Sequence, residues 1–463
     1  MNPNRNTIVP DVGRPDRVSA LLLSFLLVLT AGCGGPTPLM PTPNIYARGL
    51  AEPFENVPPA LETNTVDVLY MTDRKPELSS TPNNMKYGVK RSRSVGYGIA
   101  TVEFGNDVSW AELEKASKTG KRNVKLPMNI TKTVEIGRFP DTPKSLTESD
   151  VSSPIAETAG TRPTTTKIER DEQIVRAEAL LSERLAQVPD KEVFIFVHGY
   201  NNKFYHAVTT IAGLWHFLGR RGVPIAYTWP AGQTGLLRGY NYDRESSEFT
   251  VFHLKQMIRE VAHNPDVKKI NLIGHSRGTD VVISALRELH LEFNGAGKNT
   301  REELKLGTLI LAAPDIDFEV MVQRMTTARL GRVPERFVLY VCSKDSALGI
   351  ANWLFGGGGR AGKLTSDMFT PDELKVLRAT KSIQIVDARI KNPGAFGHDY
   401  FHSNPAVSSD LIMAMRYHMM PGEGGRPLGS DGKGFWSVDD KYPKRVTLPP
   451  TPPTTQPTAA TAN

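Results

Sequence analysis

The stretch Lys269-Ile270-Asn271-Leu272-Ile273-Gly274-His275-Ser276-Arg277-Gly278 decides how the rest of the chain is interpreted. Its first half is an apolar run typical of a buried strand, and apolar residues recur at helical spacing after Gly278. Gly-x-Ser-x-Gly between a strand and a helix predicts a tight turn that exposes the serine hydroxyl, because larger side chains on either side would collide with the neighbouring elements. The turn also points the backbone N–H of Arg277 at the helix start, where developing negative charge is stabilised.

On both sides of this turn, short apolar runs alternate with helical stretches from Thr63 to His418. The predicted strands are Val66–Met71, Gly98–Phe104, Val193–Val197, Ile225–Trp229, Lys269–Ile273, Leu306–Ala312, Phe337–Cys342 and Ile383–Val386. Helices are predicted before Val193 and over about 204–219, 244–263, 277–291, 318–328 and 371–379. This alternation predicts an α/β fold, with a mostly parallel sheet of about eight strands, helices on both faces and no large cap domain.

A serine nucleophile requires a base and an acid, which are expected later in the chain in the order acid, then histidine. Asp345 follows the strand Phe337–Cys342, and His398 lies in the loop after the last predicted strand. We therefore predict that His398 takes the proton from Ser276 and that Asp345 orients the imidazole. The alternatives are His402 for the base and Asp315 or Asp317 for the acid, while His275 is expected to serve packing.

The second oxyanion donor is expected in the loop His198-Gly199-Tyr200-Asn201-Asn202, which follows the third predicted strand. A His-Gly pair there allows the backbone to approach the serine closely. The N–H of Tyr200 is the predicted donor beside that of Arg277, with Asn201 as the alternative. Trp229-Pro230, at the end of the next strand, suits a pocket wall or a buried aromatic equally well.

The N-terminus has the pattern of an export signal: Arg14 and Arg17 precede the apolar run Ala20–Leu29, which ends at Thr30-Ala31-Gly32-Cys33. Small residues followed by cysteine resemble a bacterial lipoprotein box, although Thr30 stands where Leu is usual. The resemblance implies a signal peptide over 1–32, a palmitate-bearing lipid on Cys33 and a location in the bacterial cell envelope, with the inner or outer membrane left open. Residues 33–62 are expected to form a flexible tether.

The remaining boundaries follow from composition. Residues 63–418 are expected to form one domain, with a Ser-, Thr- and Pro-rich surface excursion over 119–170. The Gly-, Pro- and Thr-rich residues 419–463 are expected to be a disordered tail.

Composition also excludes several classes of protein. Cys33 and Cys342 are the only two cysteines among 463 residues, and the ten histidines lack metal-ligand spacing, so no metal or other cofactor is expected. The net charge of +7 is mild for this length, and no basic run is interleaved with aromatics, so nucleic acid is not an expected partner. The oligomeric state stays open.

The chain resembles the alpha/beta hydrolases, and within them the bacterial esterase/lipase-superfamily branch catalogued as domain of unknown function 900. The segments that carry the resemblance are Val66–Arg74, Tyr87-Gly88, His198–Asn202, Trp229-Pro230, Gly274–Gly278, Ala313–Asp317 and Gly397–Phe401. The resemblance implies the fold and a serine-hydrolase mechanism but names no substrate. We expect a membrane-tethered, carboxylesterase-like enzyme that acts on a small-molecule or lipid ester, thioester or amide. The alternative is a catalytically weak scaffold that binds a cell-envelope partner.

Overall fold

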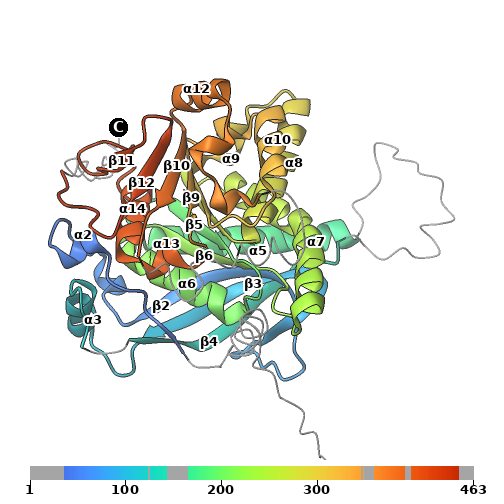
Figure 1. Ribbon diagram of the computed structural model, residues 1–463. Coiled ribbons are helices and arrows are strands. Elements are labelled where there is room, and N and C mark those ends of the chain that lie inside the picture. The colour runs from blue at the N-terminus through green and yellow to red at the C-terminus, as the bar shows by residue number, and fades with distance from the viewer. Residues whose placement is uncertain are drawn as a thin grey trace, which may run out of the picture.

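The computed structural model describes residues 36–123, 126–142, 165–345, 348, 359–391 and 398–447 (Figure 1). The strands are β1 (Thr37–Pro38), β2 (Thr65–Pro76), β3 (Tyr87–Phe104), β4 (Pro127–Arg138), β5 (Glu192–Val197), β6 (Val223–Thr228), β7 (Lys269–His275), β8 (Leu306–Ala312), β9 (Arg336–Val341), β10 (Ile383–Ala388), β11 (Gly429–Ser430) and β12 (Phe435–Val438). The helices are α2 (Asn44–Ala47), α3 (Trp110–Ser117), α5 (Thr165–Ala186), α6 (Phe204–Phe217), α7 (Leu236–His263), α8 (Gly278–Gly295), α9 (Thr300–Leu304), α10 (Phe318–Thr327), α12 (Pro371–Ala379), α13 (Tyr400–Ser403) and α14 (Pro405–Met415).

The described strands form one sheet in the order β1-β4-β3-β2-β6-β5-β7-β8-β9-β10-β12-β11. From β2 to β12 every neighbouring pair is parallel, and the antiparallel pairs lie at the two ends of the sheet. The predicted mostly parallel sheet is confirmed, with more strands than the expected eight. In parallel sheets of this kind, binding sites form at the carboxyl ends of the strands.

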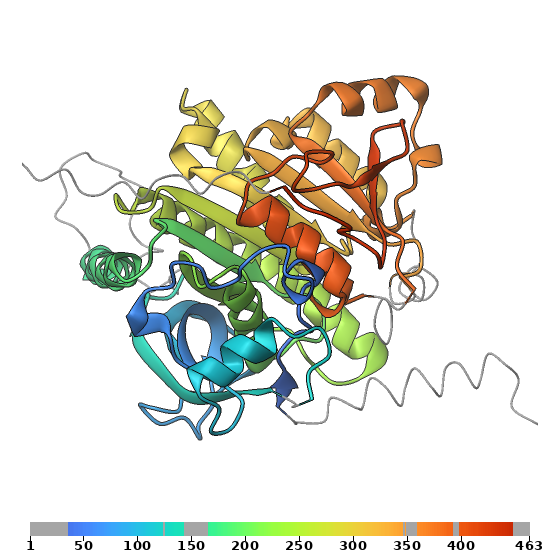
Figure 2. The same cartoon turned by 90° about the vertical axis from the view of Figure 1, so that its left-hand side faces the viewer.

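The helices cover both faces of the sheet, as predicted, and the two layers can be followed in Figures 1 and 2. Alternate residues of β5 point to opposite faces of the sheet and pack in different hydrophobic cores. Phe194 and Phe196 pack with α6 and α14, whereas Val193 and Ile195 pack with α5, α7 and α8. Because both faces are buried, the central strands are almost continuously apolar.

Part of the predicted surface excursion over 119–170 is a strand, and the prediction is wrong for that part. Residues 127–138 form β4, which pairs with β3 on one side and with β1 on the other. Its burial alternates only weakly, because much of the strand faces solvent. A polar strand of this kind lacks the apolar run on which the prediction relied.

The expected tether over 33–62 is also folded from Thr37 onward. Thr37 pairs with Met128, and Ile45 and Tyr46 are buried against the body. The Tyr46 hydroxyl donates to the carbonyl of Phe217 (2.8 Å). The anchoring residues are scattered among prolines and threonines, so they form no periodic pattern. Residues 33–35 lie outside the described residues.

The expected disordered tail is likewise folded as far as Thr447. β12 pairs in parallel with β10 and buries Phe435 and Val438. Arg426 is fully buried in an ion pair with Asp410 (2.9 Å). The few side chains that anchor this segment are separated by glycines and prolines, so the composition gave no sign that the segment is folded. Residues 448–463 lie outside the described part.

The predicted signal peptide over 1–32 and Cys33, the predicted lipidation site, also lie outside the described residues. Within the part of the chain that is described, no helix combines the length and the apolar character that a membrane span requires.

Candidate active site at the carboxyl edge of the sheet

Ser276 lies in the sharp turn between β7 and α8. Its φ of 53° is in the left-handed region, which costs energy for a residue with a Cβ. Three backbone hydrogen bonds hold the turn: the Ser276 N–H donates to the carbonyl of Ala312 (3.0 Å), and its own carbonyl accepts from Thr279 (3.0 Å) and Asp315 (3.2 Å). This is the strand, turn and helix that the Gly-x-Ser-x-Gly pattern predicts.

Close contacts require glycine at 278 and leave little room for a side chain at 274. A Cβ on Gly278 would lie 2.4 Å from the carbonyl oxygens of Val197 and His198, and a Cβ on Gly274 would lie 3.2 Å from the Cα of Thr279. The turn is therefore packed backbone against backbone on the end of β5, as the spacing of the motif implies.

Asp345 and His398 meet at the same edge. Asp345 follows β9 and is fully buried, and its Oδ2 lies 2.7 Å from Nδ1 of His398. Its other carboxylate oxygen accepts from the Leu348 N–H (3.0 Å), which fixes the carboxylate plane. Burial lowers the pKa of His398, but the hydrogen bond and charge of Asp345 outweigh burial, so the pKa is raised from its ordinary value.

The alternative acids have other partners. Asp315 forms ion pairs with Arg277 (3.1 Å) and Arg360 (3.4 Å). Asp317 caps the start of α10 by accepting from the N–H groups of Glu319 and Val320. Of the predicted acids, Asp345 is the one that contacts His398 within the described residues.

His275 connects the nucleophile turn to the His398 loop. Its ring lies 4.9 Å from the His398 ring, and its Nε2 lies 3.2 Å from the His398 carbonyl oxygen. Burial and the nearby His398 lower the pKa of His275 to about 3, so it is neutral and can donate to that carbonyl. Among the described residues, no hydrogen bond joins the Ser276 hydroxyl to His398. Such bonds are often long before substrate binds.

The His-Gly loop after β5 packs directly against the serine. A Cβ on Gly199 would lie 2.4 Å from the Cβ and 3.0 Å from the Oγ of Ser276. The N–H of Asn201 donates to Asp243 (2.9 Å) and is therefore occupied. No described residue accepts from the N–H of Tyr200 or of Arg277. Of the two donors considered for this loop, the geometry favours Tyr200.

The Arg277 side chain points into a network of its own. It contacts Asp315 (3.1 Å), Asp280 (3.2 Å) and the Tyr240 hydroxyl (2.7 Å). Burial lowers the pKa of Arg277, but these neighbours outweigh it and the guanidinium stays charged. These contacts fix the side chain, and the role predicted for Arg277 at the site is that of its backbone N–H.

Two buried charged residues that hold the His-Gly loop had no role assigned from sequence. Arg74 donates to the carbonyls of Asn202 (2.8 Å), Ala231 (2.9 Å) and Gly88 (2.9 Å). Asp243 accepts from the N–H groups of Asn201 and Gly232. The His-Gly loop is therefore held by the Asn202 carbonyl, which accepts from Arg74, and by the Asn201 N–H, which donates to Asp243. Arg74 belongs to a segment that carried the family resemblance, whereas nothing in the sequence singled out Asp243.

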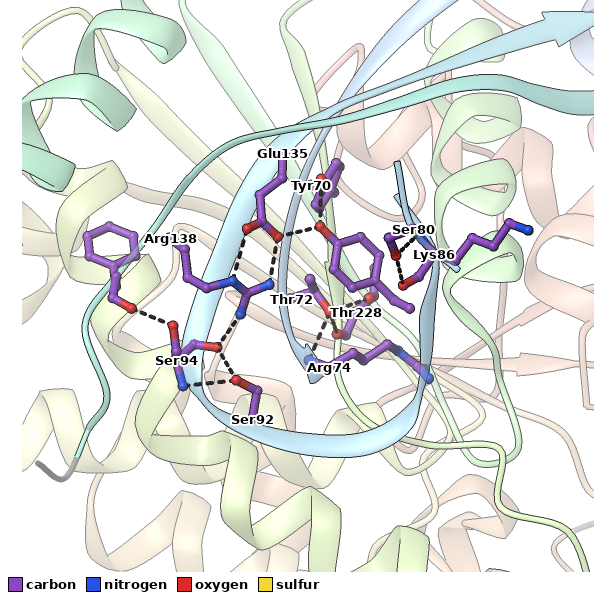
Figure 3. Close-up of polar contacts among 12 residues, drawn as sticks. Tyr70, Thr72, Arg74, Ser80, Lys86, Ser92, Ser94, Glu135, Arg138 and Thr228 are labelled. Carbon is purple, nitrogen blue, oxygen red and sulfur yellow. Dashed lines mark hydrogen bonds and ion pairs between the residues drawn. The ribbon is translucent and has the colours of Figure 1, made fainter. Parts of the chain in front are cut away.

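Figure 3 shows the surroundings of Arg74 at the end of β2. Its backbone N–H donates to the Thr72 hydroxyl (3.1 Å), which in turn donates to the carbonyl of Thr228 on β6 (2.7 Å). Trp229, one residue further, is fully buried, stacks on His198 and donates to the His198 carbonyl (2.7 Å). Trp229 therefore holds the His-Gly loop in place through His198.

In the described part of the chain, no group of three or more His, Cys, Asp or Glu side chains is arranged to hold a metal ion. The doubly covered parallel sheet and its strand-turn-serine-helix unit define the class as alpha/beta hydrolase.

The chain belongs to the family described as alpha/beta hydrolase of unknown function (DUF900), whose model matches residues 174–416. β1 to β4 therefore precede the matched range. No curated protein matches the chain.

Among solved structures, two crystal structures of mutants of the esterase rPPE are similar in part. One is 13% identical over 47% of this chain and 71% of that chain, with a TM-score of 0.19. The other is 12% identical over 57% and 78%, with a TM-score of 0.21.

Proposed function

We propose that the protein is a serine hydrolase of carboxylesterase type, with Ser276 as nucleophile, His398 as base and Asp345 as the residue that orients His398. The observation that carries the proposal is the 2.7 Å contact between Asp345 and Nδ1 of His398, at the edge where Ser276 lies in its strained turn. This contact leaves Nε2 of His398 as the nitrogen for proton transfer.

The reaction then proceeds through an acyl-enzyme. The Ser276 oxygen attacks the ester carbonyl carbon while His398 takes the hydroxyl proton. The N–H groups of Tyr200 and Arg277 stabilise the negative oxygen of the tetrahedral intermediate. The C–O bond to the leaving group breaks, and His398 returns the proton to the departing alcohol. Water, deprotonated by His398, then attacks the acyl group and releases the acid and Ser276.

The proposal includes tethering to the cell envelope through a lipid on Cys33. Its support is the apolar run that ends in Ala31-Gly32-Cys33, behind two arginines. The residues after Cys33 reach the folded body within a few positions, since Thr37 is already paired with β4.

The test is labelling of the full chain with a fluorophosphonate, which reacts only with a serine activated by its base. Wild type should label, Ser276→Ala and His398→Ala should not, and Asp345→Asn should label slowly. His402→Ala is the matched control, because it removes the neighbouring histidine and should leave labelling intact. A folded wild type that fails to label would overturn the proposal and favour the scaffold that binds an envelope partner.

A further inference from the structure

We infer that the loop joining β2 to β3, residues 77–86, is the surface by which the body contacts the membrane, and that the substrate is an ester carried in that membrane. We call this segment the β2–β3 hairpin. The inference rests on the proposed lipid on Cys33 and on the proposed hydrolysis at Ser276. It adds the orientation of the body and the class of substrate.

The direction in which the chain enters the body is the first argument. β1 runs antiparallel to β4, with Thr37 opposite Met128 and Pro38 opposite Pro127. The chain before Thr37 therefore leaves toward the later residues of β4. Cys33 lies four residues before Thr37, and four residues span at most about 14 Å. A lipid on Cys33 therefore keeps the pair Thr37 and Met128 within about 14 Å of its own attachment point at the bilayer.

The β2–β3 hairpin lies against the same strand. The N–H of Met85 donates to the carbonyl of Thr133 (3.0 Å), and the N–H of Thr133 donates to the carbonyl of Asn83 (3.1 Å). Thr133 is five residues beyond Met128 on β4, a separation of about 17 Å. The hairpin is thus on the side toward which the anchored segment points.

The hairpin and its flanks have the chemistry of a membrane contact. Leu78 is fully exposed, and Lys75, Lys86 and Lys90 in the same segment are exposed. Glu77 is the only acidic residue from 75 to 90. A single exposed leucine is common on protein surfaces. Here it belongs to a segment, residues 75–90, that carries three exposed lysines against one acidic residue, which suits insertion of one apolar side chain among anionic lipid headgroups.

The hairpin is joined to the candidate active site through Arg74. One guanidinium donates to Gly88 at the start of β3 and to Asn202 in the loop that packs on Ser276. In Figure 3, Arg74 lies where β2 ends and Lys86 lies at the hairpin. A hairpin resting on the bilayer therefore brings the site to the membrane surface, where an ester held among lipids can reach it.

The first experiment measures whether position 78 enters the bilayer. The full chain is reconstituted through its own anchor in vesicles of phosphatidylcholine and phosphatidylglycerol that contain brominated lipid, which quenches nearby tryptophan. Leu78→Trp should add fluorescence that brominated lipid quenches. Val376→Trp is the matched control, since Val376 is an exposed aliphatic residue on α12, and its added fluorescence should not be quenched. Equal quenching of the two variants, or failure of the wild type to float with vesicles, would overturn the inference.

The second experiment distinguishes the role of the β2–β3 hairpin in membrane contact from hydrolysis at Ser276. Leu78→Asp should lower hydrolysis of a fluorogenic ester embedded in the vesicles about tenfold, and leave hydrolysis of soluble p-nitrophenyl butyrate unchanged. Val376→Asp should change neither rate. Unchanged hydrolysis of the embedded ester in Leu78→Asp would refute the substrate class. If wild type cleaves neither ester while Leu78→Trp is quenched, the proposed function fails and the membrane surface stands.

Discussion

Replacing Gly199 by alanine tests whether the loop after β5 and the nucleophile turn form one catalytic unit. The added Cβ would lie 2.4 Å from the Cβ of Ser276, whereas ordinary contacts begin at 3.4 Å. The loop or the serine must therefore move by about 1 Å, the difference between those two distances. The loop includes Tyr200, so its N–H moves relative to the serine oxygen.

The expected cost follows from that displacement. A misplacement of about 1 Å in an active site lowers the rate about 100-fold. Loss of one oxyanion donor costs about 100-fold to 1000-fold, mostly in kcat. Overpacking itself destabilises a protein by about 1–3 kcal/mol. Gly199→Ala should therefore lose about 100-fold in kcat while it still folds.

The assay is steady-state hydrolysis of p-nitrophenyl butyrate together with urea unfolding. The control is Gly295→Ala at the end of α8, where nothing lies within 4 Å of an added Cβ, and its kcat should match the wild type. If Gly199→Ala keeps kcat within about threefold of wild type, the loop does not supply the oxyanion donor and the reasoning is refuted.

The remaining predictions concern the base, the loop and the C-terminal segment. Because Asp345 outweighs burial and raises the pKa of His398, kcat/KM should rise with pH through a midpoint above 6.5; in a pH–rate profile of Asp345→Asn, the midpoint should be lower and kcat should fall about 10³- to 10⁴-fold. Asp243→Asn removes the charge and one of the two carboxylate oxygens that together accept from the N–H groups of Asn201, Gly232 and Gln233, so urea unfolding should show a loss of about 1–3 kcal/mol and kcat should fall more than KM changes; an unaltered kcat would remove the positioning role. Arg426→Met leaves the Asp410 carboxylate buried without its ion pair, so the free energy of unfolding should drop by about 3–5 kcal/mol while kcat per folded molecule stays constant; a drop below about 1 kcal/mol would contradict the burial described here.

The central strands and the nucleophile turn could be predicted because their signals are local. Val193–Val197 and Lys269–Ile273 are apolar runs buried on both faces. The Gly-x-Ser-x-Gly spacing around Ser276 is complete within five consecutive residues, although Gly278 meets the distant carbonyls of Val197 and His198. The order of acid and histidine after the serine, with their places after strands, predicted Asp345 and His398 and left Asp315, Asp317 and His402 as alternatives. The structure brings Asp345 and His398 into contact.

The missed parts depend on partners distant in the sequence. β4 is a polar strand whose place is set by pairing with β1 and β3, and β12 is four residues long and is placed by β10. Arg74 and Asp243 are charged residues buried by contacts with loops far along the chain. Burial of a charge requires such partners, and no local pattern reveals them.

The position of β12 has a consequence for the order in which the molecule becomes complete. β12 is synthesised after β10, and until it pairs, the outer side of β10 presents unpaired N–H and C=O groups. A nascent or clipped chain that ends before Val438 therefore carries an open parallel edge that a second chain can join. β12 covers this side of β10, and its loss should be detected by proteases and chaperones before any loss of chemistry at Ser276.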